Sequence, residues 1–166
     1  MKKLVLAVLA AVACLPLSLA GQTAADLKEF SQVMMLEGLP LTLVHLNDKT
    51  VQVLFQPPTL YSMRARAHDT TMLYVQGTAT RTVELDSTTF MIDQGGQAVT
   101  SLPTNIKNFV KGKNKLGQDD RVDGVLTFAK AIDVSKPFTV KHGRDIATFQ
   151  FTGAQVKAMT TVPPAQ

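Results

Sequence analysis

From residue 39 onward, apolar residues alternate with polar ones over short runs that turn residues separate. The clearest alternation occupies 122–128, and the same period of two recurs at 138–140 and 147–151. A period of two puts the apolar side chains on one face of a strand. The pattern therefore predicts three half-buried strands in the last third of the chain. The stretch "KHGRD" between the last two predicts a tight turn at Gly143.

The middle of the chain predicts further strands. The runs 41–46 and 51–56 flank Asn47 and Asp48, which suggests a hairpin. After Pro57 and Pro58, the runs 59–67 and 71–79 are candidate strands on either side of His68 and Asp69. A further strand over 83–92 would turn back at the sequence "QGGQ", residues 94–97.

The residues just before this region have apolar side chains at a different spacing. In 23–36 the apolar residues Leu27, Phe30 and Met34 are three and four residues apart, and Thr23 precedes them as a candidate N-cap. This spacing predicts a short amphipathic helix or an ordered arm. Gly38 and Pro40 would end it.

Together these elements predict a mainly β protein: an antiparallel β-sandwich with a short N-terminal helix or arm. The expected organisation is a signal peptide over 1–20, a helix or tether over 21–38, the sandwich over 39–156 and a flexible tail over 157–166.

The first twenty residues have the layout of a secretory signal peptide. Lys2 and Lys3 precede an apolar stretch, and Ser18 and Ala20 form a small-residue cleavage site before Gly21. We therefore expect an exported protein, periplasmic or secreted, without a membrane span. The alternative is a lipoprotein on the membrane surface, because "VAC", ending at Cys14, resembles the end of a lipobox.

Charge changes this picture little. Removing Lys2 and Lys3 from the 17 basic side chains leaves 15 against 13 acidic ones, a net charge near +2. This balance argues against a nucleic-acid partner. The lysines of "KGKNKLGQDDRVDG", residues 111–124, indicate a solvated loop that leads into a strand, and its aspartates lack the spacing of a calcium loop.

The candidate metal ligands are His45, His68 and His142, which no short spacing pairs. Scattered methionines suggest copper as a metal for such a site. Core packing explains the methionines more simply, because the thioether side chain fills irregular gaps. We expect no cofactor.

No catalytic motif is evident. His142 and Asp145 flank a turn, but no serine lies in a nucleophile-elbow sequence. The sequence also contains no phosphate-binding glycine loop and no cysteine or histidine residues at the spacing of a zinc site. The chain is therefore not expected to be an enzyme.

The stretch "KLGQDDRVDGVLTFAKAIDVSKPFTVKHGRDIATFQF", with "ELDSTTFMIDQGGQ" before it, resembles a family of bacterial exported immunoglobulin-like domains of unknown function. The family is related to telokin-like and secreted-antigen-like sandwiches. The similarity covers roughly 74–152 and implies an immunoglobulin-like fold without catalytic residues.

The expected function is that of a non-catalytic β-sandwich module that is structural or binds another protein of the cell envelope or extracellular space. The alternative is a carrier of a small ligand or a copper-type metal that uses histidine and methionine side chains.

Overall fold

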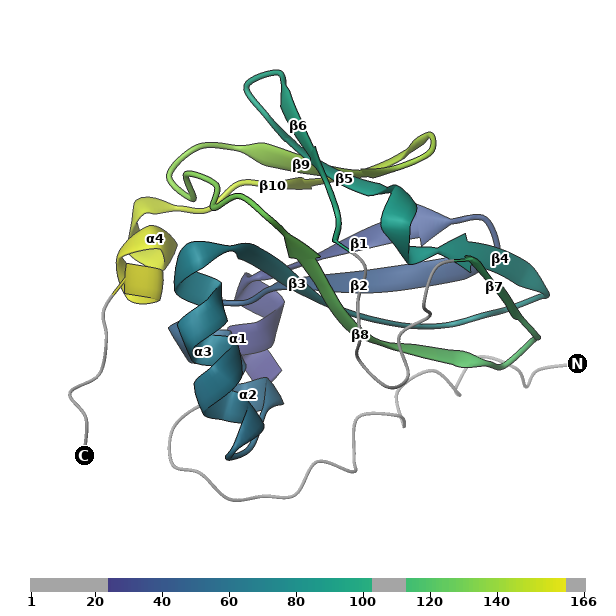
Figure 1. Cartoon of the computed structure of the whole chain (residues 1–166), viewed down its shortest axis with the longest axis horizontal. Helices are drawn as coiled ribbons and strands as arrows, with labels where there is room; N and C mark the ends of the chain where they lie inside the picture. Colours follow the sequence, from purple (N-terminus) through teal and green to yellow (C-terminus); the bar gives the residue numbers. More distant parts are fainter. Residues whose placement is uncertain (1–23, 103–112, 161–166) are drawn as a thin grey trace, which may run out of the picture.

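The computed structural model describes residues 24–102 and 113–160. Predictions for the signal peptide, Cys14, Thr23, Lys111 and the end of the tail lie outside the described residues. Figure 1 shows two antiparallel sheets with helices beside one of them.

Four strands form the first sheet, in the order β1-β2-β3-β8. A turn at Gly38, whose φ is +79°, joins its first two strands. The strands are β1 (Ser31–Leu36), β2 (Leu39–His45), β3 (Thr71–Thr78) and β8 (Arg121–Phe128).

The second sheet has the order β10-β9-β5-β6, and a two-stranded ribbon of β4 and β7 accompanies it. Turns through Gly95 and Gly96, and through Gly143, have the positive φ that glycine adopts readily. The strands are β4 (Val83–Asp86), β5 (Phe90–Gln94), β6 (Gln97–Thr100), β7 (Lys113–Leu116), β9 (Phe138–His142) and β10 (Asp145–Phe149), and a short 3₁₀ helix, η1 (Ser87–Thr89), lies between β4 and β5.

The two sheets bury a common core, so the predicted mainly β, antiparallel sandwich is confirmed. The alternating residues of 122–128, 138–140 and 147–149 point into this core as expected. Side chains from both sheets contribute to it, among them Leu41, Leu43, Leu73, Val75, Leu126, Phe128, Phe90, Ile92, Phe138, Val140 and Phe149.

The sheets also approach each other at their edges. At one edge, Ser101, just after β6, forms an antiparallel bridge with Phe128 at the end of β8. At the other edge, β1 of the first sheet lies beside β10 of the second. The sandwich is therefore nearly closed, which limits the open strand edges available to another chain.

The helices α1 (Ala24–Glu29), α2 (Asp48–Leu54) and α3 (Thr59–Asp69) lie on the side of the first sheet that faces away from the second (Figure 1). The prediction of strands over 51–56 and 59–67, and of a hairpin at Asn47 and Asp48, was wrong. Val51, Val53 and Phe55 fit a strand period, but Val51, Leu54 and Phe55 fit a helical one, and these three pack with Met72 and Val125 on the outer face of the sheet. Tertiary packing therefore selected the helix.

The predicted N-terminal helix exists but ends at Glu29, and the chain continues as β1. Phe30 and Met34 are fully buried and Leu27 is partly buried, so this segment packs on the sandwich. At the other end, helix α4 (Gly153–Thr160) continues beyond residue 156 and buries Met159. No helix among the described residues is long and apolar enough to cross a membrane.

Candidate functional site

The structure brings two of the three candidate histidines to one cavity. His45 ends β2 and His68 lies in the last turn of α3, and both line a cavity of about 440 Å³. His142 ends β9 instead, with its ring centroid 4.5 Å from that of Phe90. Within 24–102 and 113–160, no group of three or more His, Cys, Asp or Glu side chains could hold a metal ion.

A capping box fixes the chain where β2 turns into α2. The Asn47 side chain accepts hydrogen bonds from the backbone N–H groups of Lys49 and Thr50, at 3.0 and 3.3 Å. In return, the Thr50 hydroxyl accepts from the Asn47 N–H at 2.9 Å and donates to the His45 carbonyl at 2.9 Å. These bonds satisfy backbone donors at the helix start. They also hold Asp48 in one place as the first helical residue.

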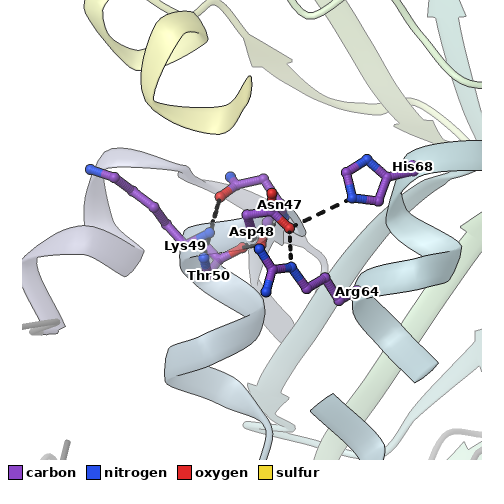
Figure 2. Close-up of polar contacts among 6 residues, drawn as sticks. All are labelled: Asn47, Asp48, Lys49, Thr50, Arg64 and His68. Atoms are coloured by element: carbon purple, nitrogen blue, oxygen red, sulfur yellow. Dashed lines mark hydrogen bonds and ion pairs between the residues drawn. The ribbon is translucent and has the colours of Figure 1, made fainter. Parts of the chain in front are cut away.

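Asp48 is the charged centre of the site. Its side chain is only 4% exposed, and Oδ1 accepts a hydrogen bond from Arg64 Nε at 2.8 Å. His68 Nε2 lies 3.7 Å from the same oxygen. Arg64 and His68 are one helical turn apart on α3, so both face α2. Figure 2 shows the side chains of Arg64 and His68 reaching from α3 toward the Asp48 carboxylate.

Several polar atoms of this cluster have no hydrogen-bond partner among the described residues. They are Asp48 Oδ2, Arg64 Nη2 and His45 Nδ1, all shielded from solvent. A buried polar group without a partner costs about 1 to 3 kcal/mol, and more when it is charged. His45 and Asp48 also line the cavity, whereas Arg64 does not, so a molecule bound in the cavity can add stabilising contacts at these two residues.

His45 is neutral in this environment. Its ring is buried near Phe138 and Phe151, with centroid distances of 6.1 and 5.4 Å. Burial lowers the pKa of His45 to about 4, because the charged form loses its hydration. The cavity therefore has a neutral imidazole on one wall and a carboxylate on another.

The wall opposite the helices comes from the connection between β8 and β9. The Thr71 hydroxyl donates to the Lys130 carbonyl at 2.7 Å and accepts from the Ile132 N–H at 3.1 Å. This clamp ties the connection to β3. The full lining is His45, Leu46, Asn47, Asp48, Ala67, His68, Thr70, Thr71, Ala131, Ile132, Val134 and Met159.

The lysine and aspartate stretch has a structural role where it is described. The Gly117 N–H donates to Asp120 Oδ2 at 2.6 Å, and the Asp119 N–H donates to the Ala79 carbonyl at 2.7 Å. These bonds form the turn that leads into β8, as the sequence predicted. The prediction of a loop was wrong for Lys113 and Lys115, because both lie on β7 and pair with β4. Most methionines pack inside the protein, since Met34, Met63, Met72 and Met159 are buried.

A second feature lies on the outer surface where β1 meets β10. Val33 and Met35 alternate with the core residue Met34, and Ile146 occupies the corresponding outward position on β10. Their side chains are 58%, 67% and 57% exposed. We call Val33, Met35 and Ile146 the seam patch. They are three of the five large apolar side chains that are strongly exposed in the described residues.

The seam patch spans two strands that lie side by side. Just outside them, Phe30 and Phe151 are in ring contact, with centroids 5.9 Å apart. From this contact the strands run past each other in opposite directions. Ile146 therefore lies toward the Met35 end of β1.

His142 is partly buried at the end of β9. Burial lowers its pKa, and a hydrogen bond with the Asp86 backbone partly opposes that effect. Its Nε2 has no hydrogen-bond partner in the described part of the chain.

Comparison of the chain with protein-family models, with curated proteins and with solved structures found no match. The resemblance to exported immunoglobulin-like domains therefore stays a prediction, and what is shown is a mainly β, antiparallel sandwich.

Proposed function

We propose that this chain is an exported, non-catalytic module that binds another protein through the seam patch. The observation that carries the proposal is the concentration of Val33, Met35 and Ile146 on two adjacent strands. Contiguous exposed apolar side chains on a folded domain typically mark an interaction surface.

The surroundings of the seam patch suit a protein partner. On β2, Val33 lies opposite Thr42 and Met35 lies opposite Pro40, and neither neighbour is charged. On β9, Ile146 lies opposite Lys141, which pairs with Asp93. Further charged residues flank the patch: Glu37 pairs with Arg81 just beyond β1, and Asp145 begins β10. An apolar centre within a polar rim is the usual anatomy of a protein interface. Methionine adds adaptability, because its flexible side chain fits partners of varied shape.

The lining of the cavity supports the non-catalytic part of the proposal. It contains no serine, cysteine or lysine. Its threonine hydroxyls already donate to carbonyls, Thr70 to Arg66 at 2.8 Å and Thr71 to Lys130 at 2.7 Å. These hydroxyls therefore donate to carbonyls and not to His45 or His68, as a nucleophile activated by a general base would.

The layout of residues 1–20 supports export. Intact-mass analysis of the protein expressed in a bacterial host tests this part. We expect a chain that begins at Gly21. A chain that begins at a lipidated Cys14 would move the protein to the membrane surface, and an uncleaved chain would contradict export.

Site-specific photo-crosslinking tests the binding surface. A photoreactive residue replaces Met35 in one variant and Tyr61 in the control, because Tyr61 on α3 is 65% exposed and lies outside the seam patch. We expect one adduct from position 35, and none from position 61. Excess wild-type protein should suppress the adduct, and excess Met35→Lys protein should not.

The mass of the adduct identifies its second component. A different polypeptide supports the proposal. An adduct of two copies of this chain would replace the proposed partner with a homodimer, and equal crosslinking from positions 35 and 61 would contradict the assignment of the surface.

A further inference from the structure

The cavity carries an inference that is independent of the seam patch. Asp48 uses one carboxylate oxygen for Arg64, and the other oxygen, Oδ2, has no partner among the described residues. A carboxylate has about four lone-pair sites, so it can accept from Arg64 and from a second donor at once. The arrangement therefore favours a ligand that brings a hydrogen-bond donor.

The remaining walls favour a hydrocarbon body. Leu46, Ala67, Ile132, Val134 and Met159 come from four separate parts of the chain and line the same cavity. Its volume of about 440 Å³ lies within the range of about 300 to 1,000 Å³ that is typical of small-molecule sites. Mostly apolar walls with a few polar atoms are also typical of such sites.

We propose that this cavity binds a small amphipathic primary amine, with its ammonium group at Asp48 and its hydrocarbon chain against the apolar wall. An ammonium group combines three donors with a charge that complements the carboxylate, which makes the hydrogen bond roughly twice as strong as a neutral one. A carboxylate ligand would be repelled by Asp48, and an alcohol would contribute a hydrogen bond without the charge. His45, which is neutral, adds no positive charge to the cavity, and Arg64, which pairs with Asp48 Oδ1, is not among the residues that line it.

Three probes with the same six-carbon chain separate these ligand classes: hexylamine, hexanol and hexanoate. The mature protein is labelled at its methyl groups, and each probe is titrated near neutral pH while NMR follows Ile132, Val134 and Met159. We expect hexylamine to bind at least tenfold more tightly than hexanol or hexanoate. The shifts should centre on these three residues.

Two variants locate the site and its charge. Asp48→Asn keeps the size of the side chain and should reduce hexylamine affinity at least tenfold while leaving hexanol affinity nearly unchanged. Ala67→Leu leaves Asp48 intact and reduces the volume of the cavity, so it should weaken both probes. Met35→Thr is the matched control, because it alters only the seam patch, and should bind hexylamine like the wild type.

Equal affinities for the amine and the alcohol would overturn the proposal, as would an Asp48→Asn variant that retains hexylamine binding. Shifts confined to residues away from the cavity would also overturn it. If Asp48→Asn does not fold, Ala67→Leu decides, since unchanged hexylamine binding in that variant would exclude the cavity. None of these outcomes depends on a protein partner at the seam patch, so the two proposals fail separately.

Discussion

The cavity and the seam patch depart from ordinary burial in opposite ways. At the cavity, polar groups are buried: the side chain of Asp48 is 4% exposed and His45 has a shielded, unpartnered nitrogen. At the seam patch, apolar groups are exposed, with Met35 67% accessible. A buried polar group without a partner and an exposed apolar side chain each carry a cost in free energy, whereas an exposed polar side chain does not.

This difference indicates two kinds of partner. A buried carboxylate oxygen gains most from a small molecule that enters the cavity and donates a hydrogen bond. An exposed apolar surface gains most from a second surface that removes it from water. The remainder of the sandwich follows the usual rule, since its core is apolar and most of its charged residues are exposed.

The sharpest test of burial uses two residues from the same segment. Phe30→Ser should lower the free energy of unfolding by about 3 to 5 kcal/mol, because it leaves a cavity between Val44, Phe151 and Met159. Val33→Ser should change it by less than about 0.5 kcal/mol, because Val33 is exposed. Denaturant unfolding measures both. Similar losses in the two variants would contradict the distinction between the buried segment and the seam patch.

The second test uses pH, because His45 folds in its neutral form. Its pKa falls from 6.5 in the unfolded chain to about 4 in the folded protein, so the unfolded state binds more protons between these values. Stability should therefore fall as the pH decreases from about 6.5 to 4, by about 3 kcal/mol from this residue.

The measurement compares the pH dependence of unfolding in wild type and in His45→Gln. The slope in this window should be smaller in the variant, whatever its stability at neutral pH. His142→Gln is the matched control and should reduce the slope less, because His142 is less buried than His45. An unchanged slope in His45→Gln would mean that His45 is not buried as a neutral ring.

The third test concerns the charged centre of the cavity. Arg64→Met leaves the Asp48 carboxylate buried without its cation and should cost about 2 kcal/mol, less than a fully buried pair because Arg64 is 27% exposed. The double variant Asp48→Asn, Arg64→Met should recover part of that loss, since no charge remains unpaired. Chemical denaturation of the wild type, of each single variant and of the double variant gives the coupling energy between Asp48 and Arg64. Strict additivity of the two single effects would show that the pair is not coupled.

Most of the sandwich was predictable because many of its strands bury one face, although β3 and β8 also bury outer residues under the helices. In 122–128 the alternation fits only a strand, and β8 occupies those residues. In 51–56, Val51, Val53 and Phe55 suggested a strand, while Val51, Leu54 and Phe55 fit the helix that forms. Local pattern could not decide between them, and packing against the sheet did. The Asn47 cap with Thr50 three residues later was the available signal for the start of α2.

The candidate site was only partly predictable for the same reason. His45 and His68 could be singled out as residue types, but Asp48 and Arg64 could not, because they meet across two helices that the pattern had not indicated. Sixteen residues separate them in the chain. The seam patch was equally hidden, since it depends on β1 and β10 lying side by side although they are far apart in sequence.

The fourth test has the smallest expected effect, about 1.4 kcal/mol or a tenfold change in affinity for a protein partner. It tests the central claim, that the seam patch binds this partner, most directly. The protein captured by crosslinking at position 35 is purified, and its affinity is measured by calorimetry for wild type, for Val33→Thr with Met35→Thr, and for Tyr61→Thr. We predict at least a tenfold loss in the seam variant and no change in the Tyr61 control. Unchanged binding by the seam variant, or an equal loss in Tyr61→Thr, would contradict the proposal that the seam patch is the binding surface.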